Sequence, residues 1–277
     1  MKLSRRQMLL STAAAAGATF FDAPAILGAD AYGGFPVGVQ SYSLRGFNML
    51  EAVRHIQGMG LHFVEFYPGH VPVTDDVAKI KEVNELLQKA KISMSAHGVH
   101  GFGADHAANE KIFAYAKAQG IKCLTANPQK ASYESLDKLC EKYKIRIAIH
   151  NHGPDALYDK IESVVDACKG RHPLFGACID TGHFIRSKEN PVEAVHRLKG
   201  RVFALHVKDE AKQEKQSHNV VIGAGHLDVT GLFQALKDTK FPADGSVSLE
   251  YEANPQNPID DMKECLEVAK ECIAKVK

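Results

Sequence analysis

Histidines and carboxylates follow a series of short apolar runs in this sequence. The run IRIAI ends in two histidines that bracket an asparagine, and the later runs FGACI, RVFAL and SVSL are also followed directly by acidic or imidazole side chains. Imidazole nitrogens and carboxylate oxygens bind first-row divalent metals, and the same groups serve as general acids and bases. The polar residues at the ends of such runs are Glu65, His97, His150, Asn151, His152, Asp180, His183, His206, Lys208, Asp209, Glu250 and Glu252.

The last of these runs carries two carboxylates on one face. Glu250 and Glu252 share a side because successive side chains of a strand point in opposite directions. A carboxylate that points into a protein interior is costly unless a cation or hydrogen bonds compensate it. A divalent metal held by acidic and imidazole side chains from successive runs would provide that compensation. The alternative is that each polar residue only satisfies local hydrogen bonds, with Glu250 paired to Lys208.

Eight apolar runs rich in β-forming residues recur along the chain, separated by amphipathic segments of helical periodicity. This alternation predicts a single (β/α)8 barrel over residues 32–277, with the strand ends gathered on the rim where such barrels carry their active sites. A doubly wound open sheet is the alternative, but the turn YSLRGFN after the first run lacks the glycines of a dinucleotide-binding turn. The predicted strands are 36–44, 62–67, 92–97, 121–126, 145–150, 175–180, 201–206 and 246–251.

Two of the predicted helices have recognisable ends. The segment 75–90 follows Thr74, which we expect to cap a helix, and the segment that begins at His106 is expected to end at Gly120. The stripe expected to face the barrel from the first of them consists of Val77, Ile80, Val83, Leu86 and Leu87.

The first 31 residues carry the features of an export signal. Arg5 and Arg6 precede an apolar, alanine-rich stretch, and ADA at 29–31 matches a signal peptidase site. We therefore expect a cleaved twin-arginine signal peptide at 1–31 and a periplasmic or otherwise exported protein. An uncleaved N-terminal anchor is the alternative.

Charge and cysteine content argue against several kinds of partner. Residues 32–277 contain equal numbers of basic and acidic residues, so we expect no nucleic-acid partner. No segment after the export signal is long and apolar enough to span a membrane. The six cysteines are widely spaced and include no CxxC pair, so we expect small buried side chains rather than disulfide partners.

The motifs IHNHG, CIDTGHF, FALHVKD, VIGAGHLDVTGLFQAL and GSVSLEYE, in this order, resemble those of the xylose isomerase-like barrels. This group includes tagatose and psicose 3-epimerases, inosose dehydratases and endonuclease IV. Looser matches in GVQSYSLR and GLHFVEFYP extend the resemblance over nearly all of 32–277. The resemblance implies one divalent ion, of manganese, zinc, cobalt or iron, bound by His150, Asp180, His206 and Glu250.

The resemblance also implies how a substrate would be held. His183 and Lys208 stand where relatives contact sugar oxygens, and we expect His97 to join them from the end of the third strand. Gly223 and Gly225 match a glycine loop of the family, which serves either as a plain tight turn or as a substrate contact.

One departure from the family pattern bears on the reaction. The epimerases usually have a glutamate at the position of His150, and a metal-bound imidazole is a poor proton shuttle. The implied function is a metal-dependent sugar isomerase or epimerase that works through a stabilised enediolate. We expect Glu250, His152 and Glu65, in that order, as candidate bases.

Three other functions remain open. A lyase acting on 3-keto-glycosides or inosose-like keto-sugars is the main alternative, and the substitution at His150 favours it. A noncatalytic sugar-binding protein is a second. An abasic-site endonuclease is a third, although it needs three zinc ions and a DNA-binding surface. The expected partner is in each of the first two cases a small sugar or keto-sugar.

Overall fold

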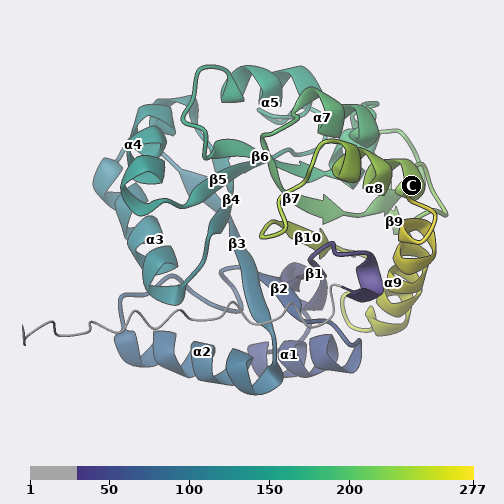
Figure 1. Cartoon of the computed structure of the whole chain (residues 1–277), viewed down its shortest axis with the longest axis horizontal. Coiled ribbons are helices and arrows are strands. Elements are labelled where there is room, and N and C mark those ends of the chain that lie inside the picture. Colours follow the sequence, from purple (N-terminus) through teal and green to yellow (C-terminus); the bar gives the residue numbers. More distant parts are fainter. Residues whose placement is uncertain (1–29) are drawn as a thin grey trace, which may run out of the picture.

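The computed structural model describes residues 30–277, in which eight parallel strands close into one barrel, as predicted (Figure 1). Around the barrel the strand order is β1, β10, β7, β6, β5, β4, β3 and β2, so the first strand pairs with the last. The barrel strands are β1 (Val37–Gln40), β2 (Phe63–Phe66), β3 (Ser93–Phe102), β4 (Cys123–Pro128), β5 (Arg146–His150), β6 (Phe175–Asp180), β7 (Val202–Val207) and β10 (Ser246–Leu249).

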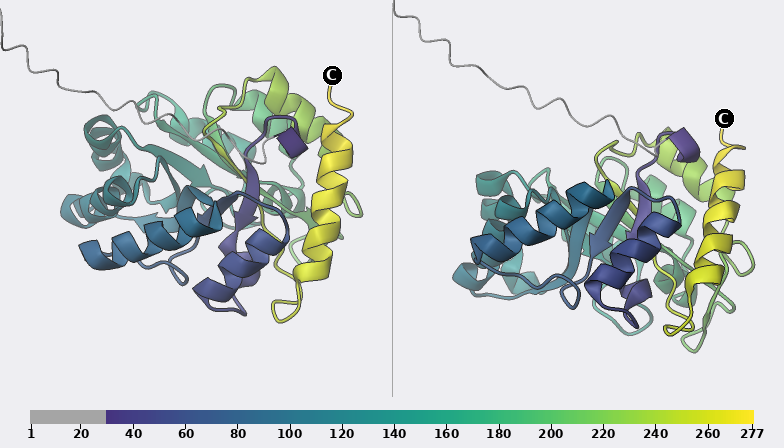
Figure 2. Two further views of the ribbon diagram at one scale, coloured as in Figure 1. Left: turned by 60° about the horizontal axis from the view of Figure 1, so that its bottom comes forward. Right: turned by 90° about the horizontal axis from the view of Figure 1, so that it is seen from below.

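Helices form an outer layer around this barrel, and Figure 2 shows α1 and α9 lying along its outside. They alternate with the strands, so each parallel connection crosses the outer surface. The helices are α1 (Met49–Gly58), α2 (Val77–Ala90), α3 (His106–Gln119), α4 (Tyr133–Tyr143), α5 (Ile161–Cys168), α6 (Thr181–Arg186), α7 (Pro191–Arg197), α8 (Val229–Asp238) and α9 (Ile259–Ile273), with short 3-10 turns at Asp30–Tyr32, Ser41–Leu44 and Lys130–Ser132.

The strands are buried on both faces, which explains their nearly continuous apolar sequences. Every residue of β6 and β7 is buried. Ala148, Cys178 and Ala204 lie two residues before three of the strand-end residues and therefore share their inward face, where they form one cluster. All six cysteines are free and five are buried, which confirms the expectation from their spacing.

Helix ends follow the predicted pattern in one case and differ in another. Gly120 adopts a left-handed conformation (φ 82°) and ends α3, as predicted. Helix α2 is capped by Asp76, whose carboxylate accepts the N–H groups of Ala78 and Lys79, whereas Thr74 only accepts the N–H of Asp76. The predicted cap was therefore two residues early. Val77, at the first position, is consequently 77% exposed instead of facing the barrel.

Strand lengths also differ from the prediction. The first strand stops at Gln40 because residues 41–44 turn into a 3-10 helix, and β10 stops at Leu249, one residue before Glu250. Strand β3 runs five residues further than predicted, to Phe102. A small antiparallel pair, β8 (Asp209–Glu210) and β9 (Asn219–Val220), was not predicted.

The expected export signal lies almost wholly outside the described residues, since these begin at residue 30. Within residues 30–277, no helix has both the length and the apolar character that a membrane span requires.

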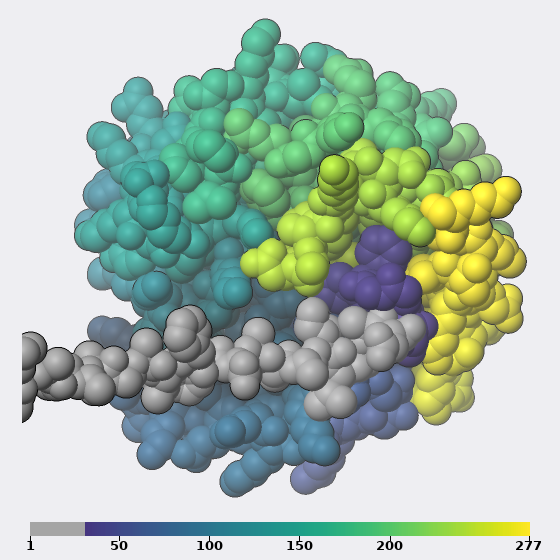
Figure 3. Space-filling model, in the orientation of Figure 1, coloured from purple at the N-terminus to yellow at the C-terminus, as the bar shows by residue number. Residues whose placement is uncertain are grey.

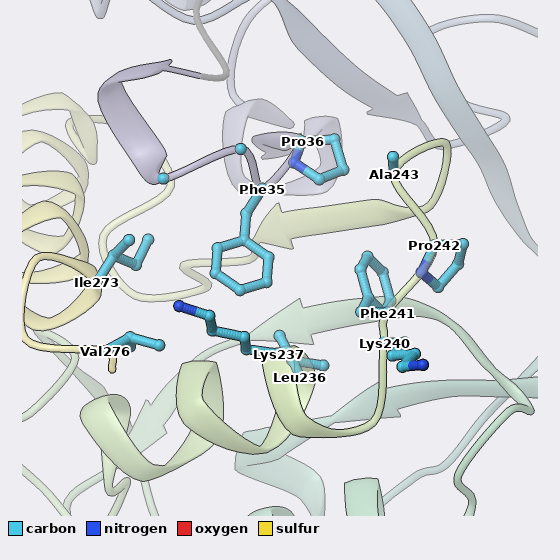
Figure 4. A pocket seen from close by; sticks show the side chains of 12 residues that line it. Phe35, Pro36, Leu236, Lys237, Lys240, Phe241, Pro242, Ala243, Ile273 and Val276 are labelled. Atoms are coloured by element: carbon cyan, nitrogen blue, oxygen red, sulfur yellow. The ribbon is translucent and has the colours of Figure 1, made fainter.

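A pocket of about 310 Å³ lies at the barrel end where β1 and β10 begin (Figure 4). The segment near residue 35, the segment near residue 240 and helix α9 lie side by side around it, in purple, yellow-green and yellow (Figure 3). Apolar side chains such as Phe35, Phe241 and Ile273 line it together with Lys237 and Lys240, and its lining includes no histidine, cysteine or carboxylate. The described residues of this pocket therefore offer no side chain of the kind that commonly binds a divalent metal.

Candidate metal centre and active site

The structure brings the four expected metal ligands together at the carboxyl-terminal rim of the barrel. His150 ends β5, Asp180 ends β6, His206 lies near the end of β7, and Glu250 directly follows β10. All four are buried, and one potential ligand atom from each lies within 4.8 Å of those of the other three. Four consecutive strands around the barrel thus supply one ligand each.

The closest approaches identify the atoms that converge. His150 Nε2 lies 3.1 Å from Asp180 Oδ2. His206 Nδ1 lies 3.0 Å from Glu250 Oε2 and 3.9 Å from the same aspartate oxygen. Two imidazole nitrogens and two carboxylate oxygens therefore face one small volume.

The donor set fits a divalent cation. His206 Nδ1 is buried and has no hydrogen-bond partner, and Glu250 Oε2, 3.0 Å away, is contacted by the ammonium group of Lys208. Buried polar atoms without a partner are uncommon in native proteins and cost about 1–3 kcal/mol each. A first-row divalent metal bound by two nitrogens and two oxygens would satisfy His206 Nδ1 and leave coordination positions for substrate.

Glu65 fixes the orientation of one ligand from beneath. Its Oε2 accepts a hydrogen bond from His206 Nε2 at 3.0 Å and one from the Ser248 hydroxyl at 3.1 Å, and its Oε1 accepts the Thr125 hydroxyl at 2.5 Å. With the proton held on Nε2, the Nδ1 lone pair of His206 points at the metal position.

Asn151 and a short helix orient Asp180. The Asn151 side chain accepts the backbone N–H of Asp180 at 2.8 Å and donates to its carbonyl at 2.9 Å. Asp180 Oδ1 accepts the N–H of His183 at 2.7 Å as the N-cap of α6. Oδ1 of Asp180 therefore caps the helix, and Oδ2 faces His150 and His206.

The cluster opens into a pocket of about 350 Å³ at this rim. Aromatic and apolar side chains from the first three strand ends form one wall, and the charged and imidazole groups form the other. The lining residues are Gln40, Tyr42, Tyr67, Pro68, Gly98, Val99, His150, His152, His183, Lys208, Glu250 and Glu252.

Lys208 is held among three carboxylates. Its Nζ lies 3.0 Å from Asp180 Oδ2 and 2.6 Å from Glu250 Oε2, and it also contacts Glu252 Oε1. Burial alone would lower the pKa of Lys208, but these carboxylates outweigh it and hold that pKa well above its ordinary value. Lys208 is therefore an ammonium ion at neutral pH.

Two imidazoles that are not metal ligands face the pocket. The rings of His152 and His183 stack with centroids 5.4 Å apart, and His152 Nδ1 has no hydrogen-bond partner. Burial lowers the pKa of His152 to about 4 and that of His183 well below its ordinary value, so both are neutral at pH 7. Arg186 donates to His183 Nδ1 at 2.7 Å, which leaves the proton of His183 on Nε2.

Sequence comparison agrees with this architecture. A model of the xylose isomerase-like TIM barrel family matches residues 53–272. The chain belongs to this family.

Relatives within the xylose isomerase-like family are distant. An inosose dehydratase of Clostridium botulinum is 29% identical over 147 residues, which are 45% of this chain and 47% of that protein. The chain thus spans about half the length of the curated relatives it matches. The crystal structure of an uncharacterised protein from Parabacteroides distasonis is 27% identical, covers 86% of this chain and 99% of its own, and has a TM-score of 0.67. The IOLI protein with a bound zinc atom is 17% identical, with 88% and 99% coverage and a TM-score of 0.72, and so shows the same fold.

Two predicted site residues lie apart from the pocket of this xylose isomerase-like barrel. His97 is fully buried, and its ring nitrogens are occupied at 2.8 Å by His100 Nε2 and by the carbonyl of Val71. This placement does not agree with the substrate contact expected for His97. Glu65 is also fully buried, and both of its oxygens accept hydrogen bonds, so it holds His206 instead of reaching substrate as a base. Glu65 points into the barrel below the rim, whereas His97 follows the inward-facing Ala96 and packs against Tyr115 of α3 on the outer face of β3.

The sequence reasoning did not identify the wall opposite the metal ligands. Gln40 ends β1 in the same way that His150 ends β5, and its Oε1 accepts the N–H of Tyr42 at 3.1 Å. Gln40 could have been identified from the sequence, because it is a polar residue at the end of an apolar run. Tyr42 and Tyr67, whose rings meet edge to face at 5.4 Å, carry no such signal because aromatic residues are common in cores.

The glycine loop has a structural role in this family member. Asp209, fully buried, accepts backbone N–H groups of this loop, including those of Gly223 at 2.8 Å and Gly225 at 3.0 Å. A Cβ at Gly225 would lie 2.3 Å from the carbonyl oxygen of Glu210. Of the two expected roles, these contacts favour the tight turn.

Proposed function

We propose that this chain is a divalent-metal-dependent enzyme that moves a proton on the carbon beside the carbonyl of a sugar or keto-sugar, giving isomerisation or epimerisation. The observation that carries the proposal is the four-residue cluster, whose nitrogen and oxygen atoms converge beside a polar pocket at the rim of the barrel. Membership of the xylose isomerase-like family supports it.

The side chains of the pocket could hold a metal ion and accept a proton from the substrate. A divalent ion held by His150, Asp180, His206 and Glu250 would act as a Lewis acid toward a carbonyl and an adjacent hydroxyl. His152 and Glu250 line the pocket and are the candidate bases that would accept a proton from carbon.

Further groups orient the substrate and shield it. His183, with its proton on Nε2, donates a hydrogen bond to a substrate oxygen, and the ammonium of Lys208 stabilises negative charge that develops there. Tyr42, Tyr67 and Val99 cover the opposite side, where they reduce access of water to the reacting carbon.

A lyase reaction is the second candidate function. The relatives in Clostridium are inosose dehydratases, and an imidazole at position 150 leaves the pocket without a symmetrical pair of carboxylates across the substrate. In a lyase the same proton abstraction would be followed by loss of a hydroxyl or glycosyl group from the next carbon. Lys208, protonated and lining the pocket, would stabilise the negative charge that develops on the departing oxygen.

The test combines metal content with proton NMR in heavy water. We expect about one tightly bound divalent ion per chain and exchange of a single carbon-bound proton of a keto-sugar in the metal-loaded protein. Appearance of a second sugar identifies an isomerase or epimerase, whereas appearance of an unsaturated ketone identifies the lyase. Failure to exchange any keto-sugar with the metal bound would overturn both and favour a sugar-binding protein, and about three ions per chain would favour the endonuclease.

The Asp180→Asn variant gives the matched control. It keeps the side-chain volume and the cap of α6, but removes a charged ligand. Loss of both the ion and the exchange in this variant is the expected result, and retention of the ion would contradict the assigned ligand set.

A further inference from the structure

The charged groups of the pocket are already matched with one another. Among the residues of 30–277 that line the pocket, Lys208 is the one lysine or arginine, and Asp180, Glu250 and Glu252 surround its Nζ. Together these three carboxylates carry three negative charges, which balance the ammonium ion and the two positive charges of the proposed metal ion. Neither source of positive charge is left over to bind an anionic substrate group.

Nearby cations are also occupied. Arg45 lies over the ring of Tyr42, at 4.5 Å from its centroid, and donates to the carbonyls of Tyr42 and Glu252 at 3.0 and 2.7 Å. Arg186 donates to His183 Nδ1 at 2.7 Å and to the carbonyl of Lys215 at 3.3 Å. Neither arginine is among the residues that line the pocket.

Glu252 places a further negative charge at the mouth. Its side chain is 34% exposed, in contrast to the 8% exposure of Glu250, and it contacts Lys208 through Oε1. Its backbone is fixed by Asn219, whose side chain accepts the N–H of Glu252 at 2.8 Å, and by Arg45 at the carbonyl. The carboxylate therefore has a defined position on the wall that an incoming ligand must pass.

We propose that the pocket selects uncharged polyhydroxy ketones over sugars that carry a phosphate or carboxylate, and that Glu252 is the residue that determines this selectivity. The inference rests on the proposed function and names the substrate class of the same site. Hydroxyl groups can donate to the Glu252 carboxylate, whereas an anionic group meets its charge and finds no free cation in compensation. The aromatic pair of Tyr42 and Tyr67 offers the C–H faces of a neutral ring an apolar contact.

The experiment compares binding of matched neutral and phosphorylated ketoses to the full metal-loaded protein. D-fructose with D-fructose 6-phosphate is the first pair of a panel, and calorimetry gives the dissociation constants independently of turnover. We expect the neutral member of a pair to bind at least about tenfold more tightly. In Glu252→Gln, loss of the carboxylate charge should strengthen binding of the phosphate by about tenfold or more, the effect of removing one unit charge a few ångströms from an anion.

Controls separate this outcome from other failures. Glu214→Gln removes an exposed charge from the loop between β8 and β9 and should leave the selectivity ratio unchanged. A gain of phosphate binding with one metal ion still bound cannot come from unfolding. Equal or tighter binding of the phosphates by the wild type, or an unchanged ratio in Glu252→Gln, would overturn the inference while leaving the proposed function intact. Failure of the metal-loaded protein to bind any ketose of the panel would overturn both.

Discussion

Replacement of Asp209 by asparagine should destabilise the protein by about 3 kcal/mol. The carboxylate is fully buried and accepts five backbone N–H groups. Asparagine keeps one acceptor oxygen and turns an NH2 donor toward the remaining donors, so at least two buried hydrogen bonds are lost. Hydrogen bonds to a charged group contribute about 1.5–3 kcal/mol each. The five donors are the N–H groups of Glu210, Gly223, Gly225, His226 and Leu227, at 2.8–3.0 Å.

Thermal unfolding followed by circular dichroism measures this loss. For a chain of this size, about 3 kcal/mol corresponds to a fall in Tm of roughly 6–12 °C. Asp228→Asn is the matched control in the same loop, because Asp228 is exposed, accepts the N–H of Gly231 as a helix N-cap, and asparagine caps equally well. A loss below about 1 kcal/mol in Asp209→Asn, or one no larger than in the control, would refute the assignment of this carboxylate as the centre of the loop.

Three further results are expected. Glu65→Gln should weaken metal binding by about 10- to 100-fold without abolishing it, as measured by competition with a chelator, because the variant loses the charge that holds His206. Burial lowers the pKa of His97 to about 4 and that of its partner His100 to about 3. Because both histidines of the unfolded chain take up protons below about pH 6.5 and those of the folded chain stay largely neutral, the free energy of unfolding should fall by about 5 kcal/mol between pH 6.5 and 4. In His97→Gln only His100 contributes, so this fall should be about 3 kcal/mol. Replacing the paired arginines of the N-terminal segment by lysines should retain the protein in the cytoplasm, as seen by fractionation of the expressing cells.

The four metal ligands could be predicted from the sequence because their signal is local. Each ends an apolar run, and strand geometry alone puts the ends of parallel neighbours on one rim. A helical crossover connects the strand that ends in His150 to the strand that ends in Asp180, and helical crossovers also connect the later strands that carry His206 and Glu250. Glu250 lies beside His206 for the same reason, because β10 pairs directly with the preceding barrel strand β7.

The supporting interactions could not be predicted in this way. Glu65 meets Thr125, His206 and Ser248 across sequence separations of 60, 141 and 183 residues, and nothing in its neighbourhood in the chain indicates those partners. His97 resembles the other strand-end residues, yet the loop that carries Val71 covers it. The cap of α2 shows the same limit on a smaller scale, because Thr74 and Asp76 are both good caps and the geometry of the turn decides between them.

The hydrogen bonds of Glu65 also bear on the order of folding. They join β2 to β7 and β10 through the interior of the barrel, so they cannot form until chain segments far apart in sequence have assembled. Such contacts are slow to form because a long loop must close first. His206 is therefore aligned for tight metal binding only after the last strands have joined the first ones. The rate at which tight binding appears during refolding should then report the final closure of the barrel, and the ion would stabilise the finished fold over any partly assembled intermediate.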